Sequence, residues 1–256
     1  GTMVKTPYPT GLSPPSELLD SGDTMDGANE TDCPVILYHY RSMKRGLEEL
    51  QTGRLRLCHP SDFQDPNDTW GVYAGDSRVP ISNQMFECLL EDKRDEQFVV
   101  SMCDSYNYRR MWDEYSEGHS GICIGYDTAR LEKDSELVAH KVTYTDQLPS
   151  CPDRMIFGGM DTFSLEAGLC KGIAYSHEHE WRIQRMYWVP PKEDAIFKEC
   201  SSCIACVYIG LNAVQKYSSD VQSVITSCHQ RGIRVQTIEE DSLIDERYGV
   251  LSRPSR

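Results

Sequence analysis

The sequence predicts an α+β fold in which helices flank a mixed, largely antiparallel sheet. Apolar, strand-like segments follow one another with little helix between them, most clearly at 120–127 and 139–145, which favours direct strand connections over a doubly wound parallel sheet. No Gly-rich phosphate loop joins a strand to a helix, which excludes the commonest nucleotide-binding folds. The 256 residues are enough to bury a large core.

Strand and helix patterns alternate along the chain. Strands are predicted from apolar and alternating segments at 34–41, 54–59, 97–103, 120–127, 139–145, 178–189, 203–211 and 234–240. Helices are predicted at 42–53, 82–95, 108–118, 161–176 and 212–231. The first of these helices has Leu47 and Leu50 at helical spacing and Gly53 as its stop signal. Residues 60–70 are rich in turn formers and predict a loop.

Both ends of the chain are predicted to be flexible tails. Residues 1–32 are rich in Pro, Gly, Ser and acidic residues, and the opening Gly-Thr-Met is typical of a vector-derived addition. We expect one domain of catalytic type at 33–245 and a second tail at 246–256. Removal of the first tail is expected to leave stability almost unchanged.

The charge balance limits the classes of partner. Twenty-six Lys and Arg against 40 Asp and Glu give a formal charge of −14, which opposes nonspecific binding of nucleic acid or anionic lipid. No apolar run reaches the roughly 18 to 20 residues of a membrane helix, and no signal pattern opens the chain. We expect a soluble cytoplasmic protein with no membrane partner.

The 11 cysteines are scattered, and several lie within apolar strand patterns. Cys200, Cys203 and Cys206 are three positions apart, which is within metal-ligand spacing. The segment continues directly into a buried strand pattern, however, so reduced core thiols are expected and a zinc site is the alternative.

Candidate site residues begin at the end of the first strand, which reads LYHYR. Alternation places Tyr38 and Tyr40 on one face and His39 and Arg41 on the other. An Arg at a strand end that faces a cleft can hold a phosphate through two hydrogen bonds. A surface Arg beside ordinary sheet aromatics is the alternative.

Two further motifs contain candidate residues with structural alternatives. In FQDPND, Pro66 restricts Asp65 in a loop that could be functional or purely structural. In the helix RRMWDEYSEG, Trp112 and Tyr115 are three apart and share a face. These two side chains would either pack in the core or form an aromatic wall for a planar ligand.

Residues 177–182 read HEHEWR and place two carboxylates two positions apart. In an extended strand, Glu178, Glu180 and Arg182 project to one face while Trp181 turns to the other. Two adjacent carboxylates repel unless a cation lies between them, and Arg182 is the expected cation. A surface strand with ordinary salt bridges is the alternative.

The order of these motifs resembles the family of domain of unknown function 2971. The resemblance covers about residues 35–185 and is carried by LYHYRSMKRGLEELQTGRLRL, FQDPND, the W-x-x-Y helix before GHSGICIGYD, KVTYTD, and Lys171 ahead of EHEWRI. The family loop usually reads Asn-Asp-Pro before an aromatic residue. Here Gln64 replaces the Asn and Asn67 replaces the aromatic residue.

The layout of that family is similar to a divergent ADP-ribosyltransferase, which implies NAD as substrate and no metal. In such enzymes a late-strand Glu contacts the nicotinamide ribose and stabilises the cationic sugar as nicotinamide leaves. The resemblance implies catalytic roles for Glu180, Glu178 and Tyr115. It implies cofactor-binding roles for His39, Tyr40, Arg41, Asp65, Trp112 and Arg182.

We therefore expect an enzyme that cleaves the nicotinamide–ribose bond of NAD and transfers ADP-ribose to a protein or nucleic-acid acceptor. A metal-dependent phosphodiesterase or nuclease is the first alternative, with a divalent cation held by Asp65, Asp68, Glu178 and Glu180. Arg182 on the same face as these carboxylates disfavours a metal there. A non-catalytic nucleotide-binding module is the second alternative.

Overall fold

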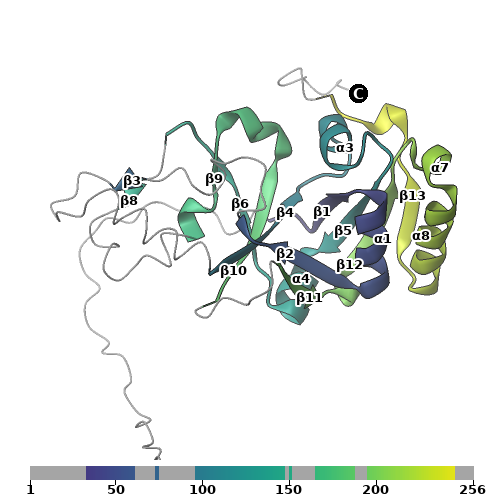
Figure 1. The fold of residues 1–256 in the computed structure, drawn as a ribbon, viewed down its shortest axis with the longest axis horizontal. Helices are drawn as coiled ribbons and strands as arrows, with labels where there is room; N and C mark the ends of the chain where they lie inside the picture. The colour runs from purple at the N-terminus through teal and green to yellow at the C-terminus, as the bar shows by residue number, and fades with distance from the viewer. Residues whose placement is uncertain are drawn as a thin grey trace, which may run out of the picture. The chain divides into compact units, whose positions relative to one another are not determined.

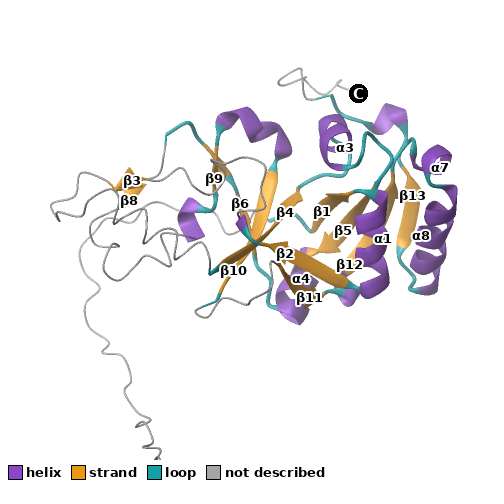
Figure 2. Cartoon of the chain, viewed as in Figure 1, coloured by secondary structure: helices purple, strands orange, loops and turns teal. Residues whose placement is uncertain are grey.

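A mixed sheet forms the centre of the protein in this computed structural model (Figures 1 and 2). Its nine strands follow the order β11-β2-β4-β1-β5-β12-β13, with β10 paired to β4 and β6 paired to β10. The structure describes residues 33–60, 73–74, 96–147, 150–151, 165–187 and 195–245. These residues all lie within the unit Cys33–Arg256.

The pairing in this sheet is antiparallel except between β12 and β13, which run parallel. The prediction of an α+β fold with a mixed, largely antiparallel sheet is therefore confirmed. The strands of the sheet are β1 (Ile36–Arg41), β2 (Arg54–Cys58), β4 (Gln97–Cys103), β5 (Ile122–Asp127), β6 (Ala139–Lys141), β10 (Glu180–Met186), β11 (Ala195–Glu199), β12 (Ile204–Ile209) and β13 (Arg234–Thr237).

Two short parallel pairs lie outside the main sheet: β3 (Tyr73–Ala74) with β8 (Ser150–Cys151), and β7 (Thr143–Tyr144) with β9 (Cys170–Lys171). The helices are α1 (Met43–Thr52), α3 (Arg109–Tyr115), α4 (Thr128–Ser135), α7 (Ala213–Lys216) and α8 (Ser218–Gln230). The described residues also include the 3₁₀ helices η2 (Ile173–Glu178), η3 (Ser201–Cys203) and η4 (Glu240–Ser242). None of the helices in the described part of the chain is long and apolar enough to cross a membrane.

Helix α1 shows how local sequence sets the element boundaries. The side chain of Ser42 accepts a hydrogen bond from the backbone N–H of Arg45, and the helix ends at Gly53 with φ 66°. Gly46 faces Ile122 on β5, where a Cβ atom would collide with the isoleucine side chain. The missing side chain therefore lets α1 approach the sheet closely.

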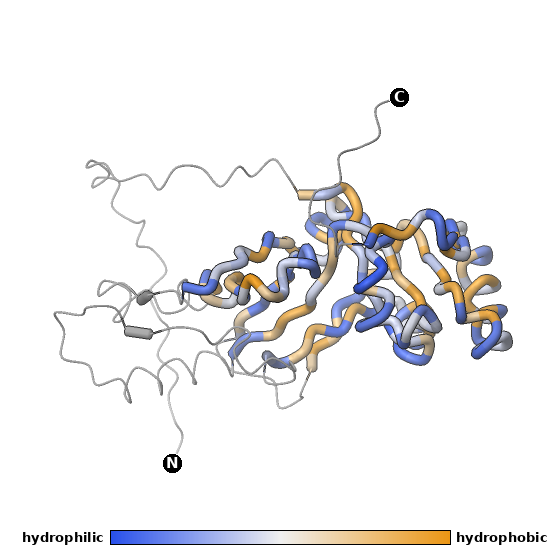
Figure 3. Tube along the Cα trace, turned by 90° about the horizontal axis from the view of Figure 1, so that it is seen from above, coloured by the Kyte–Doolittle hydropathy of each residue, from blue (hydrophilic) through white to orange (hydrophobic). Residues whose placement is uncertain are grey.

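The sheet separates two apolar clusters, and the apolar stretches of the chain follow its strands (Figure 3). The larger cluster includes Leu50 of α1, Ile124 of β5 and Val224 of α8. The smaller cluster includes Tyr40 of β1 and Trp112 of α3. Because successive side chains of a strand project to opposite faces, consecutive residues of β1 and β5 contribute to different apolar clusters.

Several predicted boundaries differ from the structure. The predicted strand at 139–145 is divided between β6 and β7, and the predicted helix at 212–231 is divided at Tyr217, whose φ of −136° is not helical. Within the predicted helix at 161–176, the described residues include β9 and most of η2. Strand β11 and helix α4 were not predicted, and the predicted helix at 82–95 lies outside the described residues.

The three closely spaced cysteines divide between the two cores. Cys200 and Cys203 belong to the larger apolar cluster and Cys206 belongs to the smaller one. All three are buried, and burial raises the pKa of Cys200 to about 11. Within the described residues, no group of three His, Cys, Asp or Glu side chains is arranged to hold a metal ion.

Candidate active site

Two buried carboxylates meet at the ammonium group of Lys171. The Lys171 Nζ lies 2.6 Å from Oε2 of Glu178 and 3.1 Å from Oε2 of Glu180. All three residues are at most 9% exposed. With their closest partners they form the Lys171 cluster, which comprises Tyr115, Lys171, Glu178, Glu180 and Arg182.

The backbone between the two carboxylates is not a regular strand. Glu178 ends the 3₁₀ helix η2, His179 has left-handed φ and ψ of 45° and 46°, and β10 begins only at Glu180. A left-handed conformation is uncommon outside Gly, although His adopts it more often than most residues do. The prediction that Glu178 lies on the same strand face is therefore wrong, and a turn brings the two carboxylates together instead.

Arg182 neutralises Glu180 from the neighbouring position on the same face of β10. Its Nε lies 2.6 Å from Oε1 of Glu180, its Nη2 lies 3.0 Å from Oε2, and its Nη1 donates to the carbonyl of Gly168 at 2.7 Å. Arg182 is 0% exposed. It provides the expected positive charge beside Glu180, but its burial leaves it no exposed surface for the cofactor-binding role that the resemblance implies.

The pKa values of the two carboxylates are shifted in opposite directions. Burial alone would raise the pKa of Glu180, but the charges of Arg182 and Lys171 outweigh it and lower this pKa to about 2. Burial is the larger effect at Glu178, where it raises the pKa although Lys171 acts in the opposite direction. Carboxylates whose pKa values separate in this way are typical of sites that use one fixed charge and one proton-exchanging group.

Tyr115 is the exposed member of the cluster. Its hydroxyl donates to Oε1 of Glu178 at 2.7 Å, and the residue is 44% exposed. Burial of the hydroxyl end and the adjacent Glu178 charge raise the pKa of Tyr115, so the phenol stays protonated and remains a donor. Tyr144 of β7 supports the other carboxylate residue, because its hydroxyl accepts a hydrogen bond from the backbone N–H of Glu180 at 2.7 Å.

His39 and Arg41 lie on the opposite face of the sheet from Glu180. Glu180 pairs with Cys103, and Cys103 pairs with Tyr38, so these three side chains share one face. His39 and Arg41 alternate with Tyr38 and project to the other face. The resemblance implied that Arg41 and the two carboxylates belong to one site, but the sheet lies between them.

A second buried charge cluster occupies that opposite face. Oε1 of Glu49 in α1 lies 3.0 Å from Nδ1 of His39 and accepts from the Tyr126 hydroxyl at 2.6 Å. Oε2 of Glu49 lies 3.2 Å from Nε of Arg41. We refer to this set as the Glu49 cluster, comprising His39, Arg41, Glu49 and Tyr126.

Two other predicted binding residues are core residues. Trp112 is 0% exposed and its indole N–H donates to the carbonyl of Tyr106 at 2.7 Å, which contradicts a role in lining a pocket. Tyr40 is 6% exposed, packs edge-on against Trp112 and donates to the carbonyl of Ser105. Asp65, with the whole FQDPND motif, lies outside the described residues.

The sequence interpretation assigned no role to Lys171 or Glu49. Lys171 precedes EHEWRI in the stretch that resembles the DUF2971 family. It lies seven residues before Glu178, a separation that predicts no contact by itself. The two side chains meet because the 3₁₀ helix η2 connects their segments. Glu49 could have been recognised as an acidic residue beside Leu50 on the apolar face of α1. A charged residue in an apolar helical stripe is a signal for a buried ion pair.

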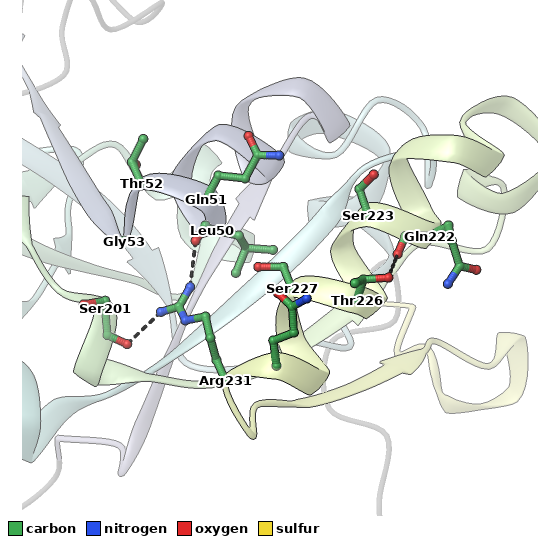
Figure 4. Close-up of a pocket in the computed structure, with 11 residues that line it drawn as sticks. Leu50, Gln51, Thr52, Gly53, Ser201, Gln222, Ser223, Thr226, Ser227 and Arg231 are labelled. Atoms are coloured by element: carbon green, nitrogen blue, oxygen red, sulfur yellow. Dashed lines mark hydrogen bonds between the residues drawn. The ribbon is translucent and has the colours of Figure 1, made fainter.

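A separate pocket is lined by residues of α1, α8 and η3 (Figure 4). It is an open groove of about 700 Å³ between the end of α1 and helix α8, lined mainly by Ser, Thr and Gln side chains. Its Arg231 donates to the carbonyls of Leu50 and Ser201 at 2.7 and 2.9 Å. None of the residues of the Lys171 cluster lines this groove.

A protein-family model supports the resemblance to the DUF2971 family found in the sequence. No curated protein matches the chain. The solved structure of Thermus sp. 2.9 DarT in complex with carba-NAD+ is similar with a TM-score of 0.40 and 12% identity, covering 82% of this chain and 98% of that chain. The model of the protein family of unknown function DUF2971 matches residues 111–183. Over this segment, which contains Tyr115, Lys171 and both carboxylates, the chain is similar to the DUF2971 family.

Proposed function

We propose that the protein is an NAD-using enzyme of ADP-ribosyltransferase type, which cleaves the nicotinamide–ribose bond and transfers ADP-ribose to an acceptor. The observation that carries the proposal is the convergence of Glu178 and Glu180 on Lys171 beside the exposed Tyr115. Departure of nicotinamide leaves positive charge on the ribose. A carboxylate fixed in a water-poor site stabilises such a charge without having to reorganise.

The contacts support different roles for the two carboxylates. Both oxygens of Glu180 are hydrogen-bonded by Arg182, and one of them also faces Lys171. Glu178 is bonded to Lys171 and to Tyr115, which extends to the surface. The resemblance favours Glu180 as the first catalytic residue, whereas these contacts favour Glu178 as the carboxylate that touches the sugar, with Glu180 as the fixed charge behind it.

The proposed reaction assigns each bond and proton. The bond between the nicotinamide nitrogen and the anomeric carbon breaks, and its electron pair leaves with nicotinamide. The acceptor then attacks the anomeric carbon through an oxygen or nitrogen atom and loses a proton. Glu178 is placed to take that proton because its raised pKa makes it the better base of the two carboxylates. Tyr115 would orient Glu178 through its hydrogen bond.

The position of Lys171 favours this chemistry over a divalent-metal mechanism at the same carboxylates. Its ammonium group lies within 3.1 Å of both carboxylates, where a shared metal ion would have to bind. A metal would therefore have to displace Lys171 from two buried ion pairs.

The test is nicotinamide release from NAD, measured with and without candidate protein and nucleic-acid acceptors. We expect Glu178→Gln and Glu180→Gln each to bind NAD but to lose roughly a hundred- to a thousandfold in rate. Glu49→Gln is the control, because it removes a buried carboxylate on the opposite face of the sheet.

Three outcomes would change the proposal. Wild-type protein that neither binds NAD nor releases nicotinamide would overturn it. Phosphodiester cleavage that requires added Mn²⁺ would replace it with the metal-dependent alternative. Loss of turnover in Glu49→Gln under conditions where the variant remains folded would return His39 and Arg41 to the site.

A further inference from the structure

We infer that Lys171 is a positioning residue that keeps Glu178 ionised and aimed for catalysis, an inference that rests on the proposed function. Lys171 Nζ is 2.6 Å from Glu178, which is the shorter of its two carboxylate contacts. Arg182 donates hydrogen bonds to Glu180 and to the carbonyl of Gly168. Within the described contacts, Lys171 is therefore the source of positive charge next to Glu178.

The backbone of Lys171 is anchored independently of its side chain. Strand β9 pairs with β7 so that Lys171 lies opposite Tyr144, and the carbonyl of Lys171 accepts from the backbone N–H of Thr145 at 2.8 Å. The ammonium group also lies 5.0 Å from the centre of the Tyr175 ring. These contacts fix the direction of the side chain and reduce the entropy lost when it engages the carboxylates.

The groups that face Glu178 come from several elements. Strand β9 contributes Lys171, β10 contributes Glu180, and α3 contributes the neutral hydroxyl of Tyr115. Tyr144 of β7 contacts the backbone of Glu180. Burial raises the pKa of Tyr144, and the charges of Glu180 and Glu178 raise it further.

Further ionisable side chains lie behind this shell. Arg182 of β10 lies behind Glu180. Nε2 of His177, next to Glu178 in η2, lies 3.4 Å from Oε2 of Glu114 in α3.

Charge counting shows what Lys171 adds. With Lys171 and Arg182 both positive and both carboxylates ionised, the four side chains sum to zero. Without Lys171, two buried carboxylates share the single charge of Arg182, which already binds Glu180 through two of its nitrogens. The like charge then favours protonation of Glu178, the carboxylate not bonded to Arg182.

The experiment follows Glu178 directly in the full-length chain labelled with ¹³C at the Glu side-chain carboxyl carbons. The Glu178 signal is assigned by its loss in Glu178→Gln, and its pKa is read from a pH titration. Lys171→Met removes the charge and keeps an apolar stem. We expect it to raise the pKa of Glu178 by about one to three pH units, the usual effect of an opposite charge at this distance.

Three further variants make the result decisive. Lys171→Gln is a second neutral change, for use if Lys171→Met does not fold, and it should raise the Glu178 pKa in the same direction. Lys171→Arg retains the charge and should leave the pKa of Glu178 close to that of wild type. Lys141→Met removes an exposed Lys from β6, which pairs with β10, and should change nothing.

Activity supplies the second measurement. The acid limb of the pH profile for nicotinamide release should move to higher pH in Lys171→Met and return in Lys171→Arg. A purely structural role would lower the melting temperature without moving this limb.

The outcomes separate this inference from the proposed function. An unchanged Glu178 pKa in both neutral variants overturns the inference, whatever the wild type does with NAD. A wild type that releases no nicotinamide overturns the proposed function, and the NMR titration still decides whether Lys171 holds Glu178 ionised.

Discussion

Two buried carboxylate clusters lie on opposite faces of one sheet and use similar side chains, yet their surroundings differ. Each contains a carboxylate, an Arg and a Tyr whose hydroxyl donates to that carboxylate. In the Glu49 cluster, Tyr126 is 1% exposed and belongs to the larger core. In the Lys171 cluster, Tyr115 is 44% exposed. Arg41 of the Glu49 cluster has a side chain that is 21% exposed, so the more exposed partner of a buried carboxylate is Tyr115 in the Lys171 cluster.

The pKa shifts of the carboxylates also differ between the two clusters. Burial raises the pKa of Glu49, but His39 and Arg41 outweigh this effect and lower it below its usual value. At Glu178 burial prevails, and the second carboxylate, Glu180, raises the pKa further. A lone carboxylate balanced by its partners stabilises the fold, whereas a second carboxylate in the same site costs stability and provides a group that can exchange a proton.

The largest expected effect on stability is at Arg182. Arg182→Met should lower the free energy of unfolding by about 3 to 5 kcal/mol, because it leaves Glu180 buried without its bidentate partner. Urea denaturation at pH 7 measures the loss. The control is Arg185→Met on the same strand, whose partner Glu136 is 86% exposed on its side chain. Equal losses in both variants would show that the Glu180–Arg182 pair contributes no more than a surface contact.

A second prediction concerns acid. Because the folded-state pKa of Glu180 is about 2 and its usual value is 4.5, the ionised carboxylate stabilises the fold fully above pH 4.5. That contribution is lost as the pH falls toward 2. Wild type should therefore lose more stability than Glu180→Gln between pH 5 and pH 2.5, as measured by urea denaturation at each pH. Parallel losses in the two proteins would contradict the lowered pKa.

A third prediction contrasts one carboxylate from each cluster. Glu49→Gln should lower the free energy of unfolding by about 1 to 3 kcal/mol, because buried hydrogen-bond partners lose an ionised acceptor. Glu178→Gln should cost less at pH 7, since its charge is unfavourable in the folded state. Thermal and urea unfolding of both variants measure the difference. A larger loss for Glu178→Gln would reverse the roles assigned to the two clusters.

The smallest effects are expected at the two tyrosines. Tyr126→Phe removes a hydroxyl from a fully buried hydrogen bond, whereas Tyr115→Phe removes one from a half-exposed side chain. Tyr115→Phe should cost about 0.5 to 1.5 kcal/mol or less, and Tyr126→Phe more, as measured by urea denaturation. If Tyr115→Phe is the more destabilising of the two, Tyr115 is a structural residue and not the accessible edge of a site.

Much of the fold could be predicted from local patterns. Strand β4 was predicted at its observed bounds, and α1 was predicted from Gly53 and the spacing of Leu47 and Leu50. Strand and helix periods are properties of a few consecutive residues, so they can be recognised before any long-range contact is known. Strand β11 was missed because its five residues, AIFKE, end in two charged residues and show no clear alternation of apolar and polar positions.

The candidate site was predicted less completely. Spacing in HEHEWR correctly associated Glu180 with Arg182, since residues two apart on a strand are neighbours. The same rule failed for Glu178, because the left-handed His179 interrupts the strand. For Trp112 and Tyr115, helical spacing indicated a shared face but could not distinguish a core position from a surface position.

Which side chains meet at the site depends on how segments distant in the sequence pair. Alternation assigns His39 and Arg41 to one side of β1, but only the register of β1, β4 and β10 shows that this side is opposite to Glu180. Lys171 reaches both carboxylates because β9 pairs with β7. A sequence pattern describes the neighbours of a residue within one element, whereas the charges that set a pKa come from every element folded around it.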